Sequence, residues 1–219
     1  MALIKAVIFD MDGLMFDTEK LWENAFSIIG KKMGYEISPE FHMKTIGTTE
    51  KKIALIFEKQ FGLDFPFDKF LFDCRKYMDG IIASGGLVIK KGLLELLDYL
   101  KANNYLIAIA SSSKLPRIKW YLKCANIDEN VFDVIVSGDD ITNGKPNPDI
   151  FLKACALLNV KPEEAMVLED SNNGIKAAAN ASCIPVLIPD LDVIKEDVFE
   201  MVKYKFSSLL DVIKFLEGE

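Results

Sequence analysis

The fold is indicated first by residues 3–13, which read LIKAVIFDMDG. A short apolar and partly β-branched run from Leu3 to Phe9 stops at two acidic residues and a glycine. Continuous apolar runs of this length are typical of strands that are covered on both faces, as in a parallel sheet. We therefore expect a buried strand whose carboxyl end presents Asp10 and Asp12.

Four further runs of the same kind follow along the chain, at residues 105–110, 131–136, 165–168 and 184–188. Helical patterns lie between them, with apolar residues recurring every three or four positions over residues 93–100 and 150–158. Strands that alternate with helices predict an α/β fold with a Rossmann-like, doubly wound parallel sheet.

One interval breaks this alternation, because the first and second runs are separated by far more chain than a single crossover helix requires. The intervening residues have helical periodicity, for example over residues 22–33, 53–61 and 67–82. We predict a small four-helix cap domain of residues 17–86, inserted into a catalytic core made of residues 1–16 and 87–219.

Composition and charge restrict the possible partners. The 219 residues are 50% hydrophobic, and 33 acidic against 26 basic residues give a formal charge of −7. This sign disfavours nucleic acid and anionic membrane surfaces as partners. The four cysteines are widely spaced and lie in apolar or helical-looking segments, which is typical of reduced thiols. We expect a cytoplasmic monomer that acts on a small molecule.

Ligands of open α/β sheets bind beyond the carboxyl ends of the strands, and acidic residues end two of the predicted strands. Asp10 and Asp12 project to the same side of an extended backbone. Glu169 and Asp170 follow the fourth run. Magnesium prefers such oxygen ligands, so a Mg²⁺ shell of Asp10, Asp170, a backbone carbonyl near Asp12 and Glu169 is predicted. The alternatives are that Asp12 caps a helix and that Glu169 and Asp170 are solvated loop carboxylates.

A hydroxyl and a cation at neighbouring strand ends suit a phosphate ligand. Ser111 and Ser112 follow the second run, where hydroxyl and backbone N–H groups can bind phosphate oxygens. Lys145 lies before the helix at residues 150–158, where its ammonium can neutralise phosphate charge or keep Asp10 ionised. The alternatives are that the serines form only a polar turn and that Lys145 is an ordinary solvated lysine. The single histidine, His42, has no partner at zinc-ligand spacing, which disfavours a zinc site or a His-dependent triad.

Taken in order, these residues resemble the motifs of the haloacid dehalogenase superfamily, and the match covers nearly the whole chain. The helical insertion resembles the cap of its β-phosphoglucomutase and phosphoglycolate phosphatase branch. The motifs read Phe9-Asp10-Met11-Asp12-Gly13, Ala110-Ser111, Gly144-Lys145-Pro146 and Leu168-Glu169-Asp170-Ser171.

The resemblance implies a role for each motif residue. Asp10 would be the nucleophile that forms an aspartyl phosphate, and Asp12 the acid and base that serves the leaving alcohol and the water. Ser111 and Lys145 would bind the transferred phosphoryl group. Asp10, the Asp12 carbonyl and Asp170 would hold magnesium, with Glu169 direct or through water. The implied activity is a magnesium-dependent phosphatase acting on a sugar phosphate or another small phosphomonoester.

Two other functions stay open at this point. The first is a β-phosphoglucomutase, which carries a cap arginine shortly after a glycine. Here that segment reads Gly47-Thr48-Thr49-Glu50, so Glu50 has the wrong sign, although Arg75 or Lys76 could supply the charge. The second is a non-catalytic protein that binds a phosphorylated metabolite, which is disfavoured because no catalytic position carries an inert residue.

Overall fold

The chain forms two compact units in this computed structural model, which describes residues 3–46 and 50–218. The first unit contains the chain up to Phe16 together with the segment from Val88 onward, and the second is Asp17–Leu87. The two segments of the first unit that flank the insertion pair with each other, since Phe16 forms a bridge with Ile89. The second unit therefore leaves and rejoins the first at adjacent backbone positions.

A six-stranded, wholly parallel sheet organises the first unit, in the order β3-β2-β1-β4-β5-β6. The central strand β1 lies between β2 and β4, with Phe9 opposite Ile109 and Leu168. The carboxyl ends of these three strands consequently meet at one edge of the sheet. The strands are β1 (Ala6–Phe9), β2 (Leu106–Ala110), β3 (Val134–Val136), β4 (Ala165–Glu169), β5 (Ile184–Leu187) and β6 (Tyr204–Lys205).

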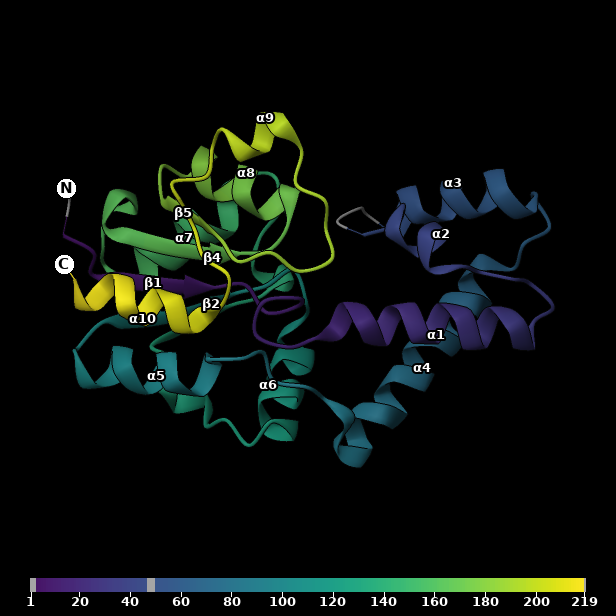
Figure 1. Ribbon diagram of the computed structural model, residues 1–219, viewed down its shortest axis with the longest axis horizontal. Coiled ribbons are helices and arrows are strands. Elements are labelled where there is room, and N and C mark those ends of the chain that lie inside the picture. Colours follow the sequence, from purple (N-terminus) through teal and green to yellow (C-terminus); the bar gives the residue numbers. More distant parts are fainter. Residues whose placement is uncertain (1–2, 47–49, 219) are drawn as a thin grey trace. The chain divides into compact units, whose positions relative to one another are not determined.

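Helices cover both faces of this sheet, as expected for a doubly wound fold (Figure 1). On one face, strand residues such as Ile8 and Val167 share a buried cluster with Phe151 of one helix and Ala177 of the next. Alternate strand residues point to the opposite face, where α5 contacts β2 and packs beside α10. The helices are α5 (Leu93–Ala102), α6 (Leu115–Cys124), α7 (Asp149–Leu158), α8 (Asn172–Asn180), α9 (Glu196–Phe199) and α10 (Leu209–Glu217).

The second unit is helical and has an aromatic core of its own. Its helices are α1 (Thr18–Lys32), α2 (Pro39–Met43), α3 (Glu50–Phe61) and α4 (Phe67–Ile81), followed by a π-helical turn, η1 (Ile82–Gly86). Phe26 and Phe57 lie with their ring centroids 5.5 Å apart, and both contact Phe70 edge-on or at a tilt. Such pairs add to simple burial of apolar area. Gly85 adopts a left-handed conformation within η1, where the helical chain ends.

The predicted fold class is confirmed, and the differences lie at strand ends. The strand predicted over residues 131–136 begins only at Val134, because residues 129–131 form a short 3₁₀ turn capped by Asp128. The first strand begins at Ala6 rather than Leu3. Strand β6 was not predicted, since Tyr204–Lys205 is too short and too polar to give an apolar signal.

Candidate active site

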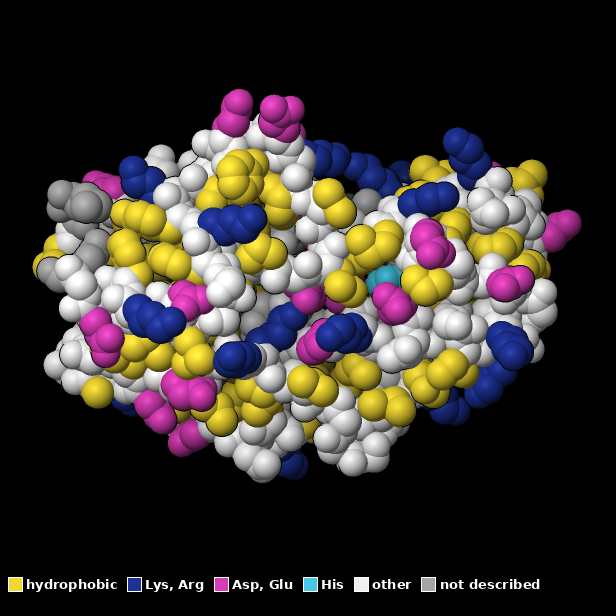
Figure 2. All heavy atoms as spheres, viewed as in Figure 1, with side chains coloured by type: hydrophobic (Ala, Val, Ile, Leu, Met, Phe, Trp, Pro, Cys, Tyr) yellow, Lys and Arg dark blue, Asp and Glu magenta, His cyan; other side chains and the backbone are white. Residues whose placement is uncertain are grey.

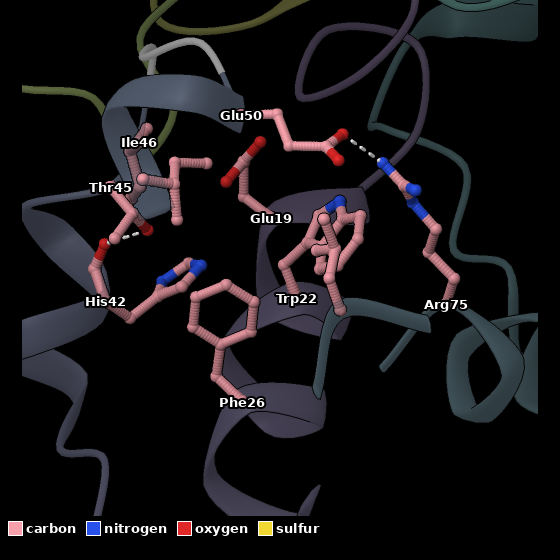
Figure 3. A pocket seen from close by; sticks show the side chains of 10 residues that line it. Glu19, Trp22, Phe26, His42, Thr45, Ile46, Glu50 and Arg75 are labelled. Atoms are coloured by element: carbon pink, nitrogen blue, oxygen red, sulfur yellow. Dashed lines mark hydrogen bonds and ion pairs between the residues drawn. The ribbon is translucent and has the colours of Figure 1, made fainter. Parts of the chain in front are cut away.

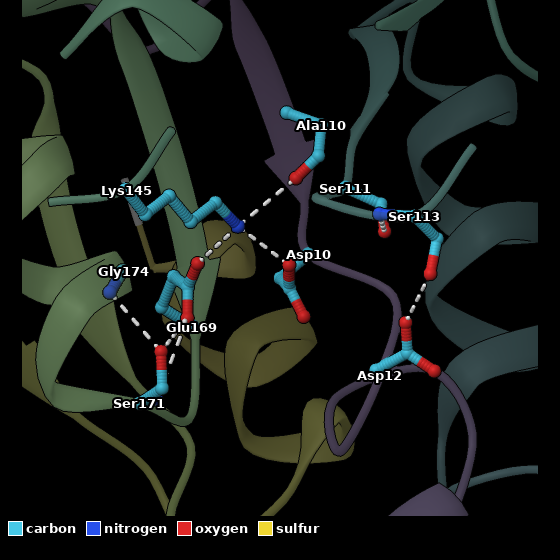
Figure 4. A network of polar contacts seen from close by, with 9 residues as sticks. All are labelled: Asp10, Asp12, Ala110, Ser111, Ser113, Lys145, Glu169, Ser171 and Gly174. Carbon is cyan, nitrogen blue, oxygen red and sulfur yellow. Dashed lines mark hydrogen bonds and ion pairs between the residues drawn. The ribbon is translucent and has the colours of Figure 1, made fainter. Parts of the chain in front are cut away.

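Asp10 stands directly beyond β1, at the centre of the carboxyl edge of the sheet. Its backbone N–H donates to the Leu168 carbonyl at 3.1 Å, so the backbone of β1 stays paired to β4 up to this residue. Its side chain is buried, and its Oδ1 accepts a hydrogen bond from Lys145 Nζ at 2.5 Å (Figure 4). The parallel register thus fixes the predicted nucleophile next to a cation.

Lys145 joins three elements at this point. Its Nζ also donates to Glu169 Oε1 at 2.6 Å and to the Ala110 carbonyl at 3.1 Å. Burial alone would lower the pKa of Lys145, but the Asp10 and Glu169 carboxylates raise it above its ordinary value. Lys145 is therefore held as a cation between two buried carboxylates rather than solvated.

The carboxylates outnumber this cation. Asp10, Glu169 and Asp170 are all buried, and one oxygen atom of each lies within 4.8 Å of the others. Burial raises the pKa of Asp10 to about 7, with repulsion from Glu169 and Asp12 acting in the same direction and Lys145 opposing them. A further positive charge would favour the ionised form of Asp10.

The donor set fits a hard divalent cation, because all three groups are carboxylates and no sulfur or imidazole is among them. Glu169 is already held by Lys145 and by Ser171 Oγ, which donates to its Oε2 at 3.0 Å. Asp10 and Asp170 are thus the better placed direct ligands, with Glu169 as a supporting group. The carboxylate of Asp12 is not one of the three.

Two glycines allow these carboxylates their positions. Gly13 has a φ of +85°, and a methyl group there would overlap the Asp170 carboxylate. Gly174 lies in the first turn of α8, where a methyl group would overlap the carboxylate of Glu169. Ser171 caps this helix by accepting from the Gly174 N–H at 3.0 Å. The sequence motifs include Gly13 and Ser171, but they do not predict the contacts of Ser171 and they do not include Gly174, whose role depends on three-dimensional packing.

The serines after β2 occupy different environments. Ser111 is buried, and its Oγ accepts from the Ser113 N–H at 3.1 Å. Ser112 is exposed. Ser113 Oγ donates to Asp12 Oδ2 at 2.9 Å, a contact that was not predicted (Figure 4). The structure therefore brings Asp10, Asp12, Ser111 and Lys145 to one edge of the sheet, as the motif order predicts.

The other predicted binding residues lie in the second unit. Glu50 and Arg75 form an ion pair of 2.6 Å on the wall of a pocket of about 190 Å³ within that unit (Figure 3). Lys76 is exposed and does not line this pocket. Gly47, Thr48 and Thr49, which enter the comparison with the mutase, lie outside the described residues.

His42 also lines this pocket, where its ring packs edge-on against Phe26, and Phe26 in turn contacts Trp22 (Figure 3). His42 is only 2% exposed, and its Nδ1 has no hydrogen-bond partner among the residues that the structure describes. Burial lowers the pKa of His42 to about 4, so the ring is neutral at neutral pH.

On the face shown in Figure 2, acidic and basic side chains are interspersed. Within residues 3–46 and 50–218, no helix combines the length and apolar character needed to cross a membrane.

The sheet, the strand-end carboxylates and the inserted helical unit define a phosphoryl-transfer class of α/β hydrolase. Residues 7–188 match the family model described as haloacid dehalogenase-like hydrolase. The chain belongs to this family and is an enzyme of its phosphatase type, as predicted.

Relatives and solved structures agree with the family assignment. The chain is 32% identical over 179 residues to a phosphorylated carbohydrates phosphatase of Thermotoga maritima, which covers 81% of this chain and 82% of the relative. The crystal structure of CbbY from Rhodobacter sphaeroides in complex with phosphate has a TM-score of 0.79 at 26% identity, covering 96% of both chains. A β-phosphoglucomutase structure from Clostridium difficile has a TM-score of 0.75 at 26% identity, covering 99% and 98%.

Proposed function

We propose that the protein is a magnesium-dependent phosphatase that hydrolyses a small phosphomonoester, a sugar phosphate or a similar metabolite, through an aspartyl phosphate on Asp10. The observation that carries this proposal is the buried Asp10 carboxylate, held by Lys145 beside Glu169 and Asp170. A nucleophile in covalent catalysis has to be ionised and oriented before it attacks. Lys145 orients Asp10 and lowers its pKa, and a bound cation would favour the ionised form further, because burial raises the pKa of Asp10 to about 7.

In the first half of the reaction, Asp10 Oδ attacks the phosphorus atom and the ester oxygen leaves. Asp12 donates its proton to that oxygen, so that a neutral alcohol departs. Ser111 and Lys145 bind the transferred phosphoryl oxygens and compensate for their charge. Most of the rate enhancement comes from positioning and charge neutralisation, since the transition state of phosphoryl transfer is loose.

In the second half, Asp12 accepts a proton from water as the water oxygen attacks the aspartyl phosphate. The bond between phosphorus and Asp10 breaks, and inorganic phosphate leaves. Asp10, Asp170 and the Asp12 carbonyl would hold magnesium, with Glu169 direct or through water. When bound there, magnesium supplies positive charge opposite the phosphate oxygens.

Phosphate release from a panel of phosphorylated metabolites tests this proposal. The wild-type protein with magnesium should release phosphate, chelator should abolish the release, and added magnesium should restore it. Asp10→Asn should remove turnover, because an amide is no anionic nucleophile. Release that is indifferent to chelator, or an Asp10→Asn variant near the wild-type rate, would contradict the mechanism.

A β-phosphoglucomutase activity is the second candidate, supported by the cation Arg75 in the pocket of the second unit. The pairing of Arg75 with Glu50 favours the phosphatase. The Glu50 carboxylate competes for the Arg75 guanidinium with the second phosphate of a bisphosphate intermediate, which a mutase has to retain. We further propose that the protein is a monomer and that it lies in the cytoplasm, the location being supported by four free cysteines.

A further inference from the structure

We propose that Ser113 is a positioning residue for Asp12, which directs the Asp12 proton toward the leaving oxygen. This inference rests on the proposed phosphatase function, since it assigns a partner to its acid and base. The contact that motivates it is the hydrogen bond from Ser113 Oγ to Asp12 Oδ2, 2.9 Å long between residues 101 positions apart (Figure 4).

Ser113 is itself held in place by backbone contacts. Its N–H donates to Ser111 Oγ at 3.1 Å, and its carbonyl accepts from the Gly138 N–H at 2.9 Å. A methyl group on Gly138 would overlap the Ser112 carbonyl, so this close approach of two loops depends on glycine. The Ser113 hydroxyl therefore starts from a fixed backbone.

A carboxylic acid carries its proton on one of two oxygens. While the Ser113 hydroxyl donates to Oδ2, that atom is the acceptor, and a proton on Asp12 would lie on Oδ1. The same hydrogen bond restricts rotation of the Asp12 side chain. Ser113 thus selects which oxygen of Asp12 delivers the proton.

The effect depends on the leaving group. An alkyl alcohol is a poor leaving group and needs the proton, whereas p-nitrophenolate leaves as an anion. General acid catalysis contributes about 10²–10⁴-fold to a rate, and loss of orientation removes part of this. For Ser113→Ala, kcat/KM for an alkyl phosphate should fall about tenfold or more beyond any fall for p-nitrophenyl phosphate. Ser113→Thr, which keeps the hydroxyl, should restore most of the difference.

Two further variants calibrate the experiment. Asp12→Asn removes the acid altogether, so it gives the largest difference between the two substrates in the fall of kcat/KM that loss of the acid can produce. Ser207→Ala is the matched control, because Ser207 Oγ donates to Asp211 Oδ2 at 2.6 Å in a similar but exposed contact. It should leave both substrates unaffected. Thermal unfolding of each variant verifies folding, and Ser113→Cys, which keeps the side-chain volume, replaces Ser113→Ala if that variant does not fold.

The outcomes separate this inference from the proposed function. A wild-type protein that hydrolyses neither substrate overturns both. A normal wild type in which Asp12→Asn discriminates between the substrates while Ser113→Ala lowers both equally overturns the positioning role alone, and indicates that Ser113 binds phosphate or supports the loop. Failure of Ser113→Thr to restore the alkyl activity also counts against it.

Discussion

Replacing Gly174 by alanine should disrupt the active site, although alanine is the better helix former. Gly174 lies in α8, where intrinsic propensity favours alanine by about 1 kcal/mol. The added methyl group would overlap the carboxylate of Glu169, which is fully buried and has no space to retreat into without leaving Lys145. The two effects have opposite signs, so their sizes decide the outcome.

The steric effect should win by a clear margin. Overpacking a buried site costs about 1–3 kcal/mol. Separating Glu169 from Lys145 breaks a buried ion pair of 2.6 Å, and leaving one partner uncompensated costs about 3–5 kcal/mol. After subtraction of the helix term, Gly174→Ala should destabilise the first unit by about 3 kcal/mol or more.

Urea unfolding followed by fluorescence of Trp120, in a Trp22→Phe background, measures this loss in the first unit. The matched control is Gly80→Ala in α4, where a methyl group meets no atom within 4 Å. Because Gly80 lies in the second unit, that variant is followed by Trp22 fluorescence in a Trp120→Phe background, and it should be neutral or slightly more stable. The reasoning would be refuted by a Gly174→Ala protein as stable and as active as the wild type, since Glu169 would then have another position with equal pairing.

Three other perturbations test separate parts of the structure. Gly13→Ala should raise the magnesium concentration needed for half-maximal activity about tenfold or more, because its methyl group displaces Asp170, and a magnesium titration measures this. Stability of the second unit should fall as pH drops from about 6.5 to about 4, because unfolded His42 takes up a proton in that range while the folded ring, with a pKa of about 4, does not. Urea unfolding by Trp22 fluorescence should show this slope, and a His42→Phe variant that keeps it would exclude His42 as the source. With β-glucose 1-phosphate and a glucose bisphosphate, phosphate release should exceed glucose 6-phosphate formation, and Glu50→Gln should shift the ratio toward isomerisation. A large excess of isomerisation in the wild type would overturn the phosphatase assignment.

Much of the active site could be predicted from sequence because strand ends in a parallel sheet converge. Asp10 and Glu169 directly end or follow apolar runs, so the sheet brings them together whatever the exact strand lengths. The errors at Val134 and Ala6 did not matter for the same reason, because the carboxyl ends of the predicted strands lie within one residue of the observed ends even where the beginnings do not.

Contacts made by loops were not predictable in this way. Ser113 reaches Asp12 only because the turn after β2 is fixed by Gly138, and a run of three serines gives no signal for which hydroxyl meets which carboxylate. Gly174 reads as an ordinary, slightly unfavourable helix residue in the sequence. Its function lies in the space it leaves for Glu169, which is a property of two elements packed together.

The charge of Glu50 shows how far a single residue can be interpreted without its partner. Taken alone, a carboxylate near the expected position of the mutase arginine would repel a far phosphate. The structure pairs it with Arg75, and both side chains are about half exposed, so the pair is worth only about 0–1 kcal/mol. A doubly charged phosphate could displace such a carboxylate at a cost of no more than about fivefold in affinity. The proposed preference for hydrolysis over isomerisation therefore has to rest on this modest competition for the Arg75 guanidinium rather than on repulsion. For this reason Glu50→Gln should shift the product ratio toward isomerisation by a measurable but limited amount.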